Sequence, residues 1–337
     1  MLRGRFLSLG EVMSHKPLFV GLVLALIAVG ATGFWFLRLR SGGDVSAPPE
    51  SETLLFVGSA SAGELLLLRE LLDAGINVNV ALTSEDFQGG DREAIEADAA
   101  AGTTALIAAA EKGQVKAVEL LIAAGANPNL SMRDGRSPIH FAAVKCHIKA
   151  LSRLIEAGAH IDGQSVRGAT PLHLASMTCP KATRLLLEHG ADPNVETVAG
   201  ETPLVIAVKF WEDKIIKLLV ASGAQVNHVG AKDGRTALHH ACTSYSLDCA
   251  TALIEAGADI EAKTTDTEMT PLMLAAEEGI GGMVQLLVEA GADVGVTDVL
   301  GRTALHIAEE HREETLRREA WRLIAKYLRE LPATSDR

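Results

Sequence analysis

Pairs of short apolar segments recur along most of this chain. In each pair the first segment follows a Ser or Thr, as in "RGATPLHLAS", and the second has Leu and Ile at helical spacing before a Gly, as in "TRLLLEHGADPN". A Ser or Thr is favoured just before a helix, and a Gly is favoured at the left-handed residue that ends one. The pattern therefore predicts repeated helix-turn-helix units.

The units keep a nearly constant length. Successive starts are 32 to 34 residues apart, at Thr104, Ser137, Thr170, Thr202, Thr236, Thr270 and Thr303. A fixed period of this size is typical of a solenoid, in which each unit buries its apolar face only against its neighbours. Such an array forms one elongated folded domain.

The repeated pattern of Gly-x-Thr-Pro-Leu-His-x-Ala-Ala, a turn Gly and a Gly-Ala-Asp-x-Asn exit resembles the ankyrin repeat. The resemblance implies an all-α ankyrin-repeat solenoid, in which hairpin loops join the helix-turn-helix units. We expect the array to span residues 53–331, as a degenerate N-terminal cap unit followed by seven repeats. The last repeat, with its long Arg- and Glu-rich "HREETLRREAWRLIAKYLRE", would be the C-terminal cap, and residues 332–337 would be a disordered tail.

The residues that open the first helix of a unit are expected to be structural. In the family the His of this pattern hydrogen-bonds around the Thr and the neighbouring hairpin, and Pro occupies the first helical position. Four His at one phase of the repeat indicate a scaffold role rather than catalysis, and other units have Ile107, Val205 or Met273 there. The residues assigned this role are Thr170, Pro171, His140, His173, His239 and His306.

An insertion separates the first two units. Between Asn79 and Thr104 the chain adds about 17 residues to the usual hairpin, in "VALTSEDFQGGDREAIEADAAAG". Insertions in solenoids often lie on the binding face, but an acidic loop with adjacent glycines is equally typical of a tolerated flexible segment.

The N-terminal region predicts a membrane anchor. Residues 17–37, "PLFVGLVLALIAVGATGFWFL", form an uncharged run of 21 residues, which is long enough to cross a bilayer as a helix. A cleavable signal peptide is the alternative, but the run continues directly into "RLR" without a small-residue cleavage site. We therefore expect an N-terminal tail (1–16), one transmembrane helix (17–37) and a linker (38–52).

Flanking charges give an orientation for this anchor. Three basic residues precede the apolar run, at Arg3, Arg5 and Lys16, and two follow it, at Arg38 and Arg40. The positive-inside rule then places the N-terminus in the cytoplasm, although Arg38 and Arg40 lie closer to the span and favour the opposite orientation. We expect a single-pass membrane protein whose array lies on the non-cytoplasmic side.

The charge of the remaining chain restricts its partners. Residues 41–337 contain 26 basic and 42 acidic residues, a net charge of −16. Such a field repels nucleic acid and anionic lipid, so we expect no nucleic-acid partner. It also keeps a solenoid soluble, and alone it identifies no partner.

The sequence leaves the oxidation state of the four cysteines open, and their positions favour unpaired thiols unless the chain lies in an oxidising location. Cys146 and Cys179 both replace the turn Gly of adjacent units, where helix spacing of about 8 to 10 Å exceeds the limit of about 7 Å for a disulfide unless the turns lean together. Cys242 and Cys249 are expected to be small buried side chains.

Sequence patterns for common catalytic and metal sites do not fit. "GSASAGE" has the spacing of a phosphate loop, but Glu64 stands where Lys is needed. There is no Gly-x-Ser-x-Gly and no Cys-x-x-Cys, and "KCH" offers only two metal ligands. We expect no cofactor, no metal and no enzyme activity, unless the fold brings distant residues together.

In proteins of this family, partners lie in a concave groove lined by hairpin tips and the ends of the inner helices. We expect contacts there from Met177, Lys209, Phe210, Trp211, Ser244 and Tyr245, with a basic rim of Arg133, Arg136, Arg167, Lys232 and Arg235. Exposed aromatic side chains clustered in such a place are typical binding anchors. The alternative for Trp211 is that it folds back onto its own repeat.

These features together predict a membrane-tethered scaffold that binds an unidentified partner protein. A structural or self-associating array is the alternative, and an enzyme with a non-sequential site is a remote one. The repeats do not identify the partner, because this scaffold hosts many unrelated binding functions. The oligomeric state is left open.

Overall fold

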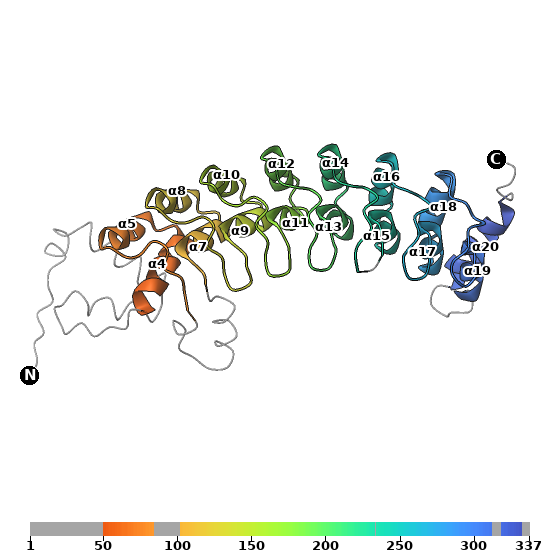
Figure 1. Cartoon of the computed structure of the whole chain (residues 1–337), viewed down its shortest axis with the longest axis horizontal. Coiled ribbons are helices and arrows are strands. Elements are labelled where there is room, and N and C mark those ends of the chain that lie inside the picture. Colours follow the sequence, from red (N-terminus) through yellow and green to blue (C-terminus); the bar gives the residue numbers. More distant parts are fainter. Residues whose placement is uncertain (1–49, 84–101, 233, 312–317, 332–337) are drawn as a thin grey trace, which may run out of the picture.

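A computed structural model describes residues 50–83, 102–232, 234–311 and 318–331, which form a curved array of paired helices (Figure 1). The predicted tail (1–16), transmembrane helix (17–37), most of the linker (38–49), the interior of the insertion (84–101) and the C-terminal tail (332–337) lie outside these residues. In the described part of the chain, no helix is both long and apolar enough to cross a membrane.

Each unit contributes an inner and an outer helix. The inner helices are α4 (Glu50–Ala62), α7 (Ala105–Glu111), α9 (Pro138–Val144), α11 (Pro171–Ala175), α13 (Pro203–Lys209), α15 (Ala237–Thr243), α17 (Pro271–Glu277) and α19 (Ala304–His311). The outer helices are α5 (Leu65–Asp73), α8 (Val115–Ala123), α10 (Ile148–Glu156), α12 (Pro180–Glu188), α14 (Asp213–Ala221), α16 (Leu247–Glu255), α18 (Gly281–Glu289) and α20 (Arg318–Glu330). Consecutive helices of each row pack side by side, and the outer row follows the convex edge in Figure 1.

The inner helices begin where the recurring Thr predicts. The Oγ1 of Thr202 accepts a hydrogen bond from the Val205 N–H at 3.4 Å, and Thr270 accepts one from Met273 in the same way. Pro203 follows at the first helical position, where a missing N–H costs nothing. Most residues of the inner helices α7, α9, α11, α13, α15 and α17 are buried against the outer row and the neighbouring units.

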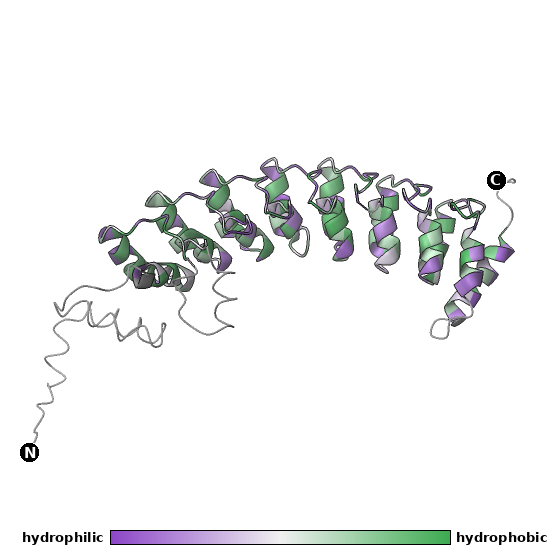
Figure 2. Ribbon diagram, turned by 60° about the horizontal axis from the view of Figure 1, so that its bottom comes forward, coloured by the Kyte–Doolittle hydropathy of each residue, from purple (hydrophilic) through white to green (hydrophobic). Residues whose placement is uncertain are grey.

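The outer helices bury only one face. Residues three or four apart point inward, as in Ala150, Leu151 and Leu154 of α10 or Ile215, Ile216 and Leu219 of α14. Together with the inner helices they form one apolar core that runs from Phe56 to Leu328, and Figure 2 shows the hydrophobic residues along both rows. The core includes the free thiols of Cys242 and Cys249, as predicted.

Backbone hydrogen bonds join successive hairpins. The Val166 N–H donates to the Asp134 carbonyl at 2.8 Å, and the Val198 N–H donates to the Arg167 carbonyl at 2.9 Å. Gly135 permits the first of these contacts, because its φ is +80° and a Cβ there would lie 2.8 Å from the Val166 nitrogen.

Asparagine side chains join the exit loops. The Oδ1 of Asn194 accepts from the Gln225 N–H at 2.8 Å, while its Nδ2 donates to the Gly223 carbonyl at 3.1 Å. Asn129 and Asn227 make the equivalent two bonds to the loops that follow them. The Asn of the repeated exit therefore ties each of these units to the next.

The two ends of the array differ from the middle. The first described helix begins at Glu50, inside the segment expected to be a linker. At the other end, α20 has 13 residues where the other outer helices have 9. Its Trp321 is buried, and its Nε1 donates to the Ala276 carbonyl at 2.9 Å, so α20 covers the last part of the core.

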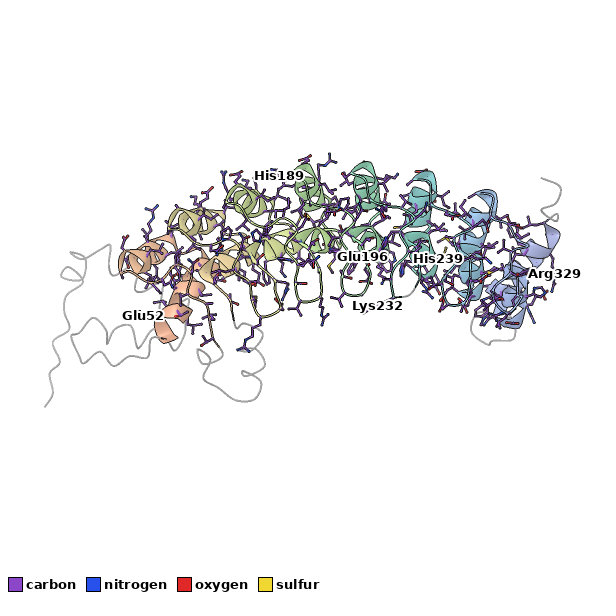
Figure 3. All side chains as sticks on the ribbon, viewed as in Figure 1. Glu52, His189, Glu196, Lys232, His239 and Arg329 are labelled. Atoms are coloured by element: carbon purple, nitrogen blue, oxygen red, sulfur yellow. A yellow bond between two sulfur atoms is a disulfide. The ribbon has the colours of Figure 1, made fainter. Side chains whose placement is uncertain are left out.

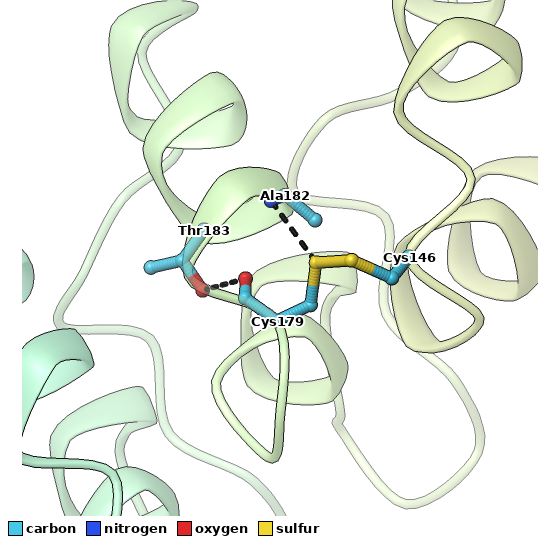
Figure 4. Close-up of a disulfide and its surroundings, with 4 residues drawn as sticks. All are labelled: Cys146, Cys179, Ala182 and Thr183. Carbon is cyan, nitrogen blue, oxygen red and sulfur yellow. Dashed lines mark hydrogen bonds between the residues drawn. A yellow bond between two sulfur atoms is a disulfide. The ribbon is translucent and has the colours of Figure 1, made fainter.

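Cys146 and Cys179 form a disulfide between neighbouring units, with Cα atoms 5.7 Å apart (Figure 4). The expectation that these two residues stay unpaired at equivalent turn positions was wrong. Cys146 does occupy the turn position, with φ +59°, but Cys179 has φ −125°, because Pro180 keeps the residue before it extended. Cys179 instead caps α12, where its Sγ accepts from the Ala182 N–H at 3.3 Å. This offset along the turn lets the two sulfur atoms meet.

Candidate partner-binding site

The repeated His residues hold the starts of the inner helices. The Nδ1 of His173 accepts from the Thr170 N–H at 3.1 Å, and its Nε2 lies 3.1 Å from the Glu201 carbonyl of the next hairpin. His140 and His239 make the same pair of contacts, whereas His306, in the last unit, accepts from the N–H of its own Thr303. Both ring nitrogens of His140, His173 and His239 are thus engaged with the backbone.

The protonation of these rings follows from their burial. Burial lowers the pKa of His140 and of His173 below the usual value of 6.5, which outweighs their hydrogen bonds to backbone carbonyls. Each ring is therefore neutral at pH 7, with Nδ1 as acceptor and Nε2 as donor. This geometry suits a scaffold role and leaves these nitrogens unavailable to a substrate. Figure 3 shows His239 among the helices.

Three aromatic side chains and one Leu lie exposed on two adjacent units. Trp211 is 67% exposed, Tyr245 50%, Phe210 42% and Leu247 43%, and we call these four residues the aromatic patch. Within the part of the chain that the structure describes, the exposed aromatic side chains are these three. Sequence reasoning missed Leu247, although an apolar residue at the first position of an outer helix was a visible signal.

Hydrogen bonds to the next unit orient the patch. The Nε1 of Trp211 donates to the Ser244 carbonyl at 2.8 Å, and the hydroxyl of Tyr245 donates to a carboxylate oxygen of Glu278 at 3.4 Å. Trp211 therefore reaches the following repeat rather than folding back onto its own. Ser244 contributes its backbone carbonyl, and its hydroxyl donates to the His240 carbonyl.

The backbone under the patch is left-handed. Trp211 has φ +61° and Tyr245 φ +60°, at the turn position where Gly113 and Gly279 have φ +68° and +71°. A residue with a Cβ pays about 1 to 2 kcal/mol for this conformation, and such costs cluster at functional sites. The two aromatic residues therefore occupy positions that glycine would fill with less strain.

Several carboxylates adjoin the aromatic patch in sequence or at the end of the next inner helix. Glu212 and Asp213 follow Trp211, and Asp248 follows Leu247. Burial raises the pKa of the Cys249 thiol, and the charges of Asp213, Asp248 and Glu212 each raise it further. Glu277 and Glu278 end the inner helix of the next unit.

The other predicted contact residues are divided between helix ends and hairpins. Lys209 is exposed and its ammonium pairs with Glu201, which lies on the hairpin before α13, whereas Met177 is half-buried. The rim residues Arg133, Arg167 and Lys232 are exposed, and Figure 3 shows Lys232 on the hairpin edge. Arg235 is half-buried.

Arg136 is engaged within its own unit. Its Nε lies 2.6 Å from Asp134, and its guanidinium stacks over the Phe141 ring at 4.6 Å from the centroid. The structure thus places the patch residues on adjacent units, and it distributes the basic rim over three hairpins. In the described residues, no group of three or more His, Cys, Asp or Glu could hold a metal ion.

A family model described as ankyrin repeats in three copies matches residues 59–165, 106–197, 194–264 and 261–318. Among curated proteins, the B-cell lymphoma 3 protein homolog of Mus musculus is 34% identical over 134 residues, which are 39% of this chain and 30% of that protein. Ankyrin repeat and SOCS box protein 16 of Homo sapiens is 34% identical over 125 residues, 37% of this chain and 27% of that protein. The chain therefore spans less than a third of these relatives.

Solved structures match a larger share. The human ASB11 ankyrin repeat domain has a TM-score of 0.58 at 31% identity, and the match covers 68% of this chain and 99% of that one. The ankyrin repeat domain of Bcl-3 has a TM-score of 0.57 at 27% identity, covering 66% and 99%. Ankyrin repeats generally mediate protein–protein interaction. The described residues form an all-helical solenoid of such repeats, and the chain belongs to the ankyrin repeat family.

Proposed function

We propose that this protein binds a partner protein through the aromatic patch and the hairpins beside it, and that residues 17–37 anchor it in a membrane. The observation that carries the proposal is the placement of Trp211 and Tyr245, exposed and left-handed, on adjacent units. Large rigid aromatic side chains supply much of the binding energy in protein interfaces. The proposed role is that of a scaffold and requires no catalysed reaction.

Replacing Trp211 tests this role. In full-length protein purified in neutral detergent, Trp211→Ala is expected to weaken capture of the partner about thirtyfold, or about 2 kcal/mol. Leu323→Ala, at a 63% exposed position on α20, is the matched control and leaves affinity unchanged. Urea unfolding of each variant separates lost contacts from lost folding.

Two results would contradict the proposal. Affinity could fall only in proportion to the unfolded fraction of Trp211→Ala, which would make the indole a stabilising group. Capture could also return only copies of this chain with the same sensitivity to Trp211, which would favour the self-associating array.

For the membrane side, we propose that the array lies outside the cytoplasm. The Cys146–Cys179 disulfide supports this, because disulfides persist in oxidising compartments and are rare in the cytosol. A Cys introduced at Ser46, with the native Cys replaced, is expected to react with a membrane-impermeant maleimide on intact cells. Reaction only after permeabilisation would place the array in the cytoplasm.

A further inference from the structure

We propose that the aromatic patch receives the side chain of an Arg or Lys from an extended segment of the partner protein. This inference rests on the proposed function and adds the chemistry of the partner.

The polar atoms of the patch are turned toward the protein. Trp211 has one polar side-chain atom, Nε1, and this donates to the Ser244 carbonyl. The hydroxyl of Tyr245 points to Glu278. Because 67% of Trp211 and 50% of Tyr245 is nevertheless exposed, what these two residues offer to solvent is mainly ring carbon. A partner group thus meets aromatic faces, whose π-electrons attract a cation.

Acidic groups outnumber basic ones around these rings. Five carboxylates lie at the turns that carry the patch or at the next inner helix end, those of Glu212, Asp213, Asp248, Glu277 and Glu278. Two lysines, Lys209 and Lys214, lie close to them in sequence, and Lys209 pairs with Glu201. The net field at the patch is therefore negative, in a chain whose residues 41–337 already carry −16. An acidic segment would be repelled, and a basic one attracted.

Aromatic faces beside carboxylates favour arginine above other side chains. A guanidinium stacks flat on a ring and at the same time donates to a carboxylate in its own plane, whereas an ammonium does only one of these well. The same pairing already occurs within this chain, where Arg136 stacks on Phe141 and binds Asp134. Leu247 extends the patch with an aliphatic surface beside Gly282 of α18, which suits an apolar residue next to the cation.

A positional peptide library tests this inference. Fluorescein-labelled octapeptide pools, each with one residue fixed, are titrated against the full-length protein in neutral detergent. We expect pools with Arg fixed to bind at least tenfold more tightly than pools with Glu fixed, with Lys between them. Binding of the best Arg peptide should fall about thirtyfold in Trp211→Ala and several-fold in Glu278→Gln. Glu188→Gln, on the exposed face of α12, is the charge-matched control and should change nothing.

The outcomes separate this inference from the proposed function. Selection of apolar or acidic pools, with binding still lost in Trp211→Ala, would overturn the cationic partner and leave the binding site in place. Absence of any pool whose binding depends on Trp211 would overturn both. Binding to phosphatidylserine vesicles that depends on Trp211 would replace the peptide by a lipid surface and also overturn the inference.

Discussion

At the scale of single residues, the turn between the inner and the outer helix holds glycine in some units and a strained larger residue in others. Glycine fills this turn at Gly113 and Gly279, and Cys146, Trp211 and Tyr245 replace it with φ near +60°. Each replacement makes a contact with a neighbouring unit that glycine could not make. The strain at these positions is therefore offset by contacts with the neighbouring unit, and two of them also present aromatic surface to solvent.

The strain at Trp211 has a measurable size. Trp211→Gly and Trp211→Ala both remove the indole and its bond to Ser244, but only glycine adopts φ +61° freely. We expect the free energy of unfolding of Trp211→Gly to be about 1 kcal/mol higher than that of Trp211→Ala. Urea titration followed by circular dichroism gives the difference. A glycine variant less stable than the alanine variant would be inconsistent with strain at this turn.

The buried His residues predict a loss of stability in mild acid. The folded-state pKa of His140 and His173 is lowered, so below pH 6.5 the unfolded chain binds protons that the folded chain does not. Stability is then full above the unfolded pKa and falls as the pH drops below it, by up to about 1.4 kcal/mol per pH unit for each ring.

Urea unfolding between pH 7.5 and pH 5.5 checks this prediction. In His140→Gln/His173→Gln the free energy of unfolding should depend less steeply on pH than in the original chain, although the variant is less stable overall. Equal slopes for the two proteins would show that these rings do not cause the acid sensitivity.

Residues that act within one unit could be predicted from the sequence, and those that depend on the neighbouring unit were harder. The Thr cap and Pro171 follow from local helix chemistry, and the role of His173 followed from the family pattern. The direction of Trp211 could not be predicted, because its partner is a backbone carbonyl 33 residues away. The same holds for the Asn194 bonds, which need the spacing between exit loops.

At the scale of helices, the unit that contains α11 departs from the repeat. Its inner helix has 5 residues where α9 and α13 have 7, and the wider turn after it ends at Cys179. Periodicity predicted the helices of this unit but not this turn, because the constraint of Pro180 acts on a single residue. Cys179 lies one residue closer to its outer helix than Cys146 does, and this offset lets the two cysteines bond.

The disulfide is expected to stabilise the array. Cys146 and Cys179 close a loop with a sequence separation of 33 residues, for which constraint of the unfolded chain gives about 3 to 4 kcal/mol. Cys146→Ser should lower the free energy of unfolding by this amount, and so should dithiothreitol acting on the original chain. A urea midpoint unaffected by dithiothreitol would show that the bond contributes nothing.

At the scale of the whole molecule, the units of the array pack against adjacent units and do not surround a central core. Among the described residues, the main helix–helix contacts lie within a unit or between adjacent units, so a defect in one unit is not compensated from elsewhere. Period and apolar pattern predicted this architecture, whereas the membrane anchor at residues 17–37 stays a prediction outside the described residues.

A defect in the middle should divide the molecule. Leu204 is 1% exposed in α13, and Leu204→Ala is expected to cost about 2 to 5 kcal/mol locally. Limited trypsin digestion with mass spectrometry should then yield cuts within residues 203–221 while α7–α10 and α17–α20 remain intact. Leu66→Ala, at a 76% exposed position, should leave the digestion pattern unchanged. Uniform digestion along the Leu204→Ala chain would indicate that the array unfolds as one block.

The covalent link between neighbouring units also has a mechanical meaning. If an anchored N-terminus and a partner-bound array are pulled apart, units that unravel lengthen the chain by about 3.5 Å per residue. The 33-residue segment closed by Cys146 and Cys179 cannot be extended by such tension, so about 115 Å of chain length is not released while the disulfide is intact. A tether built in this way has a limited extension, and reduction of the disulfide removes that limit.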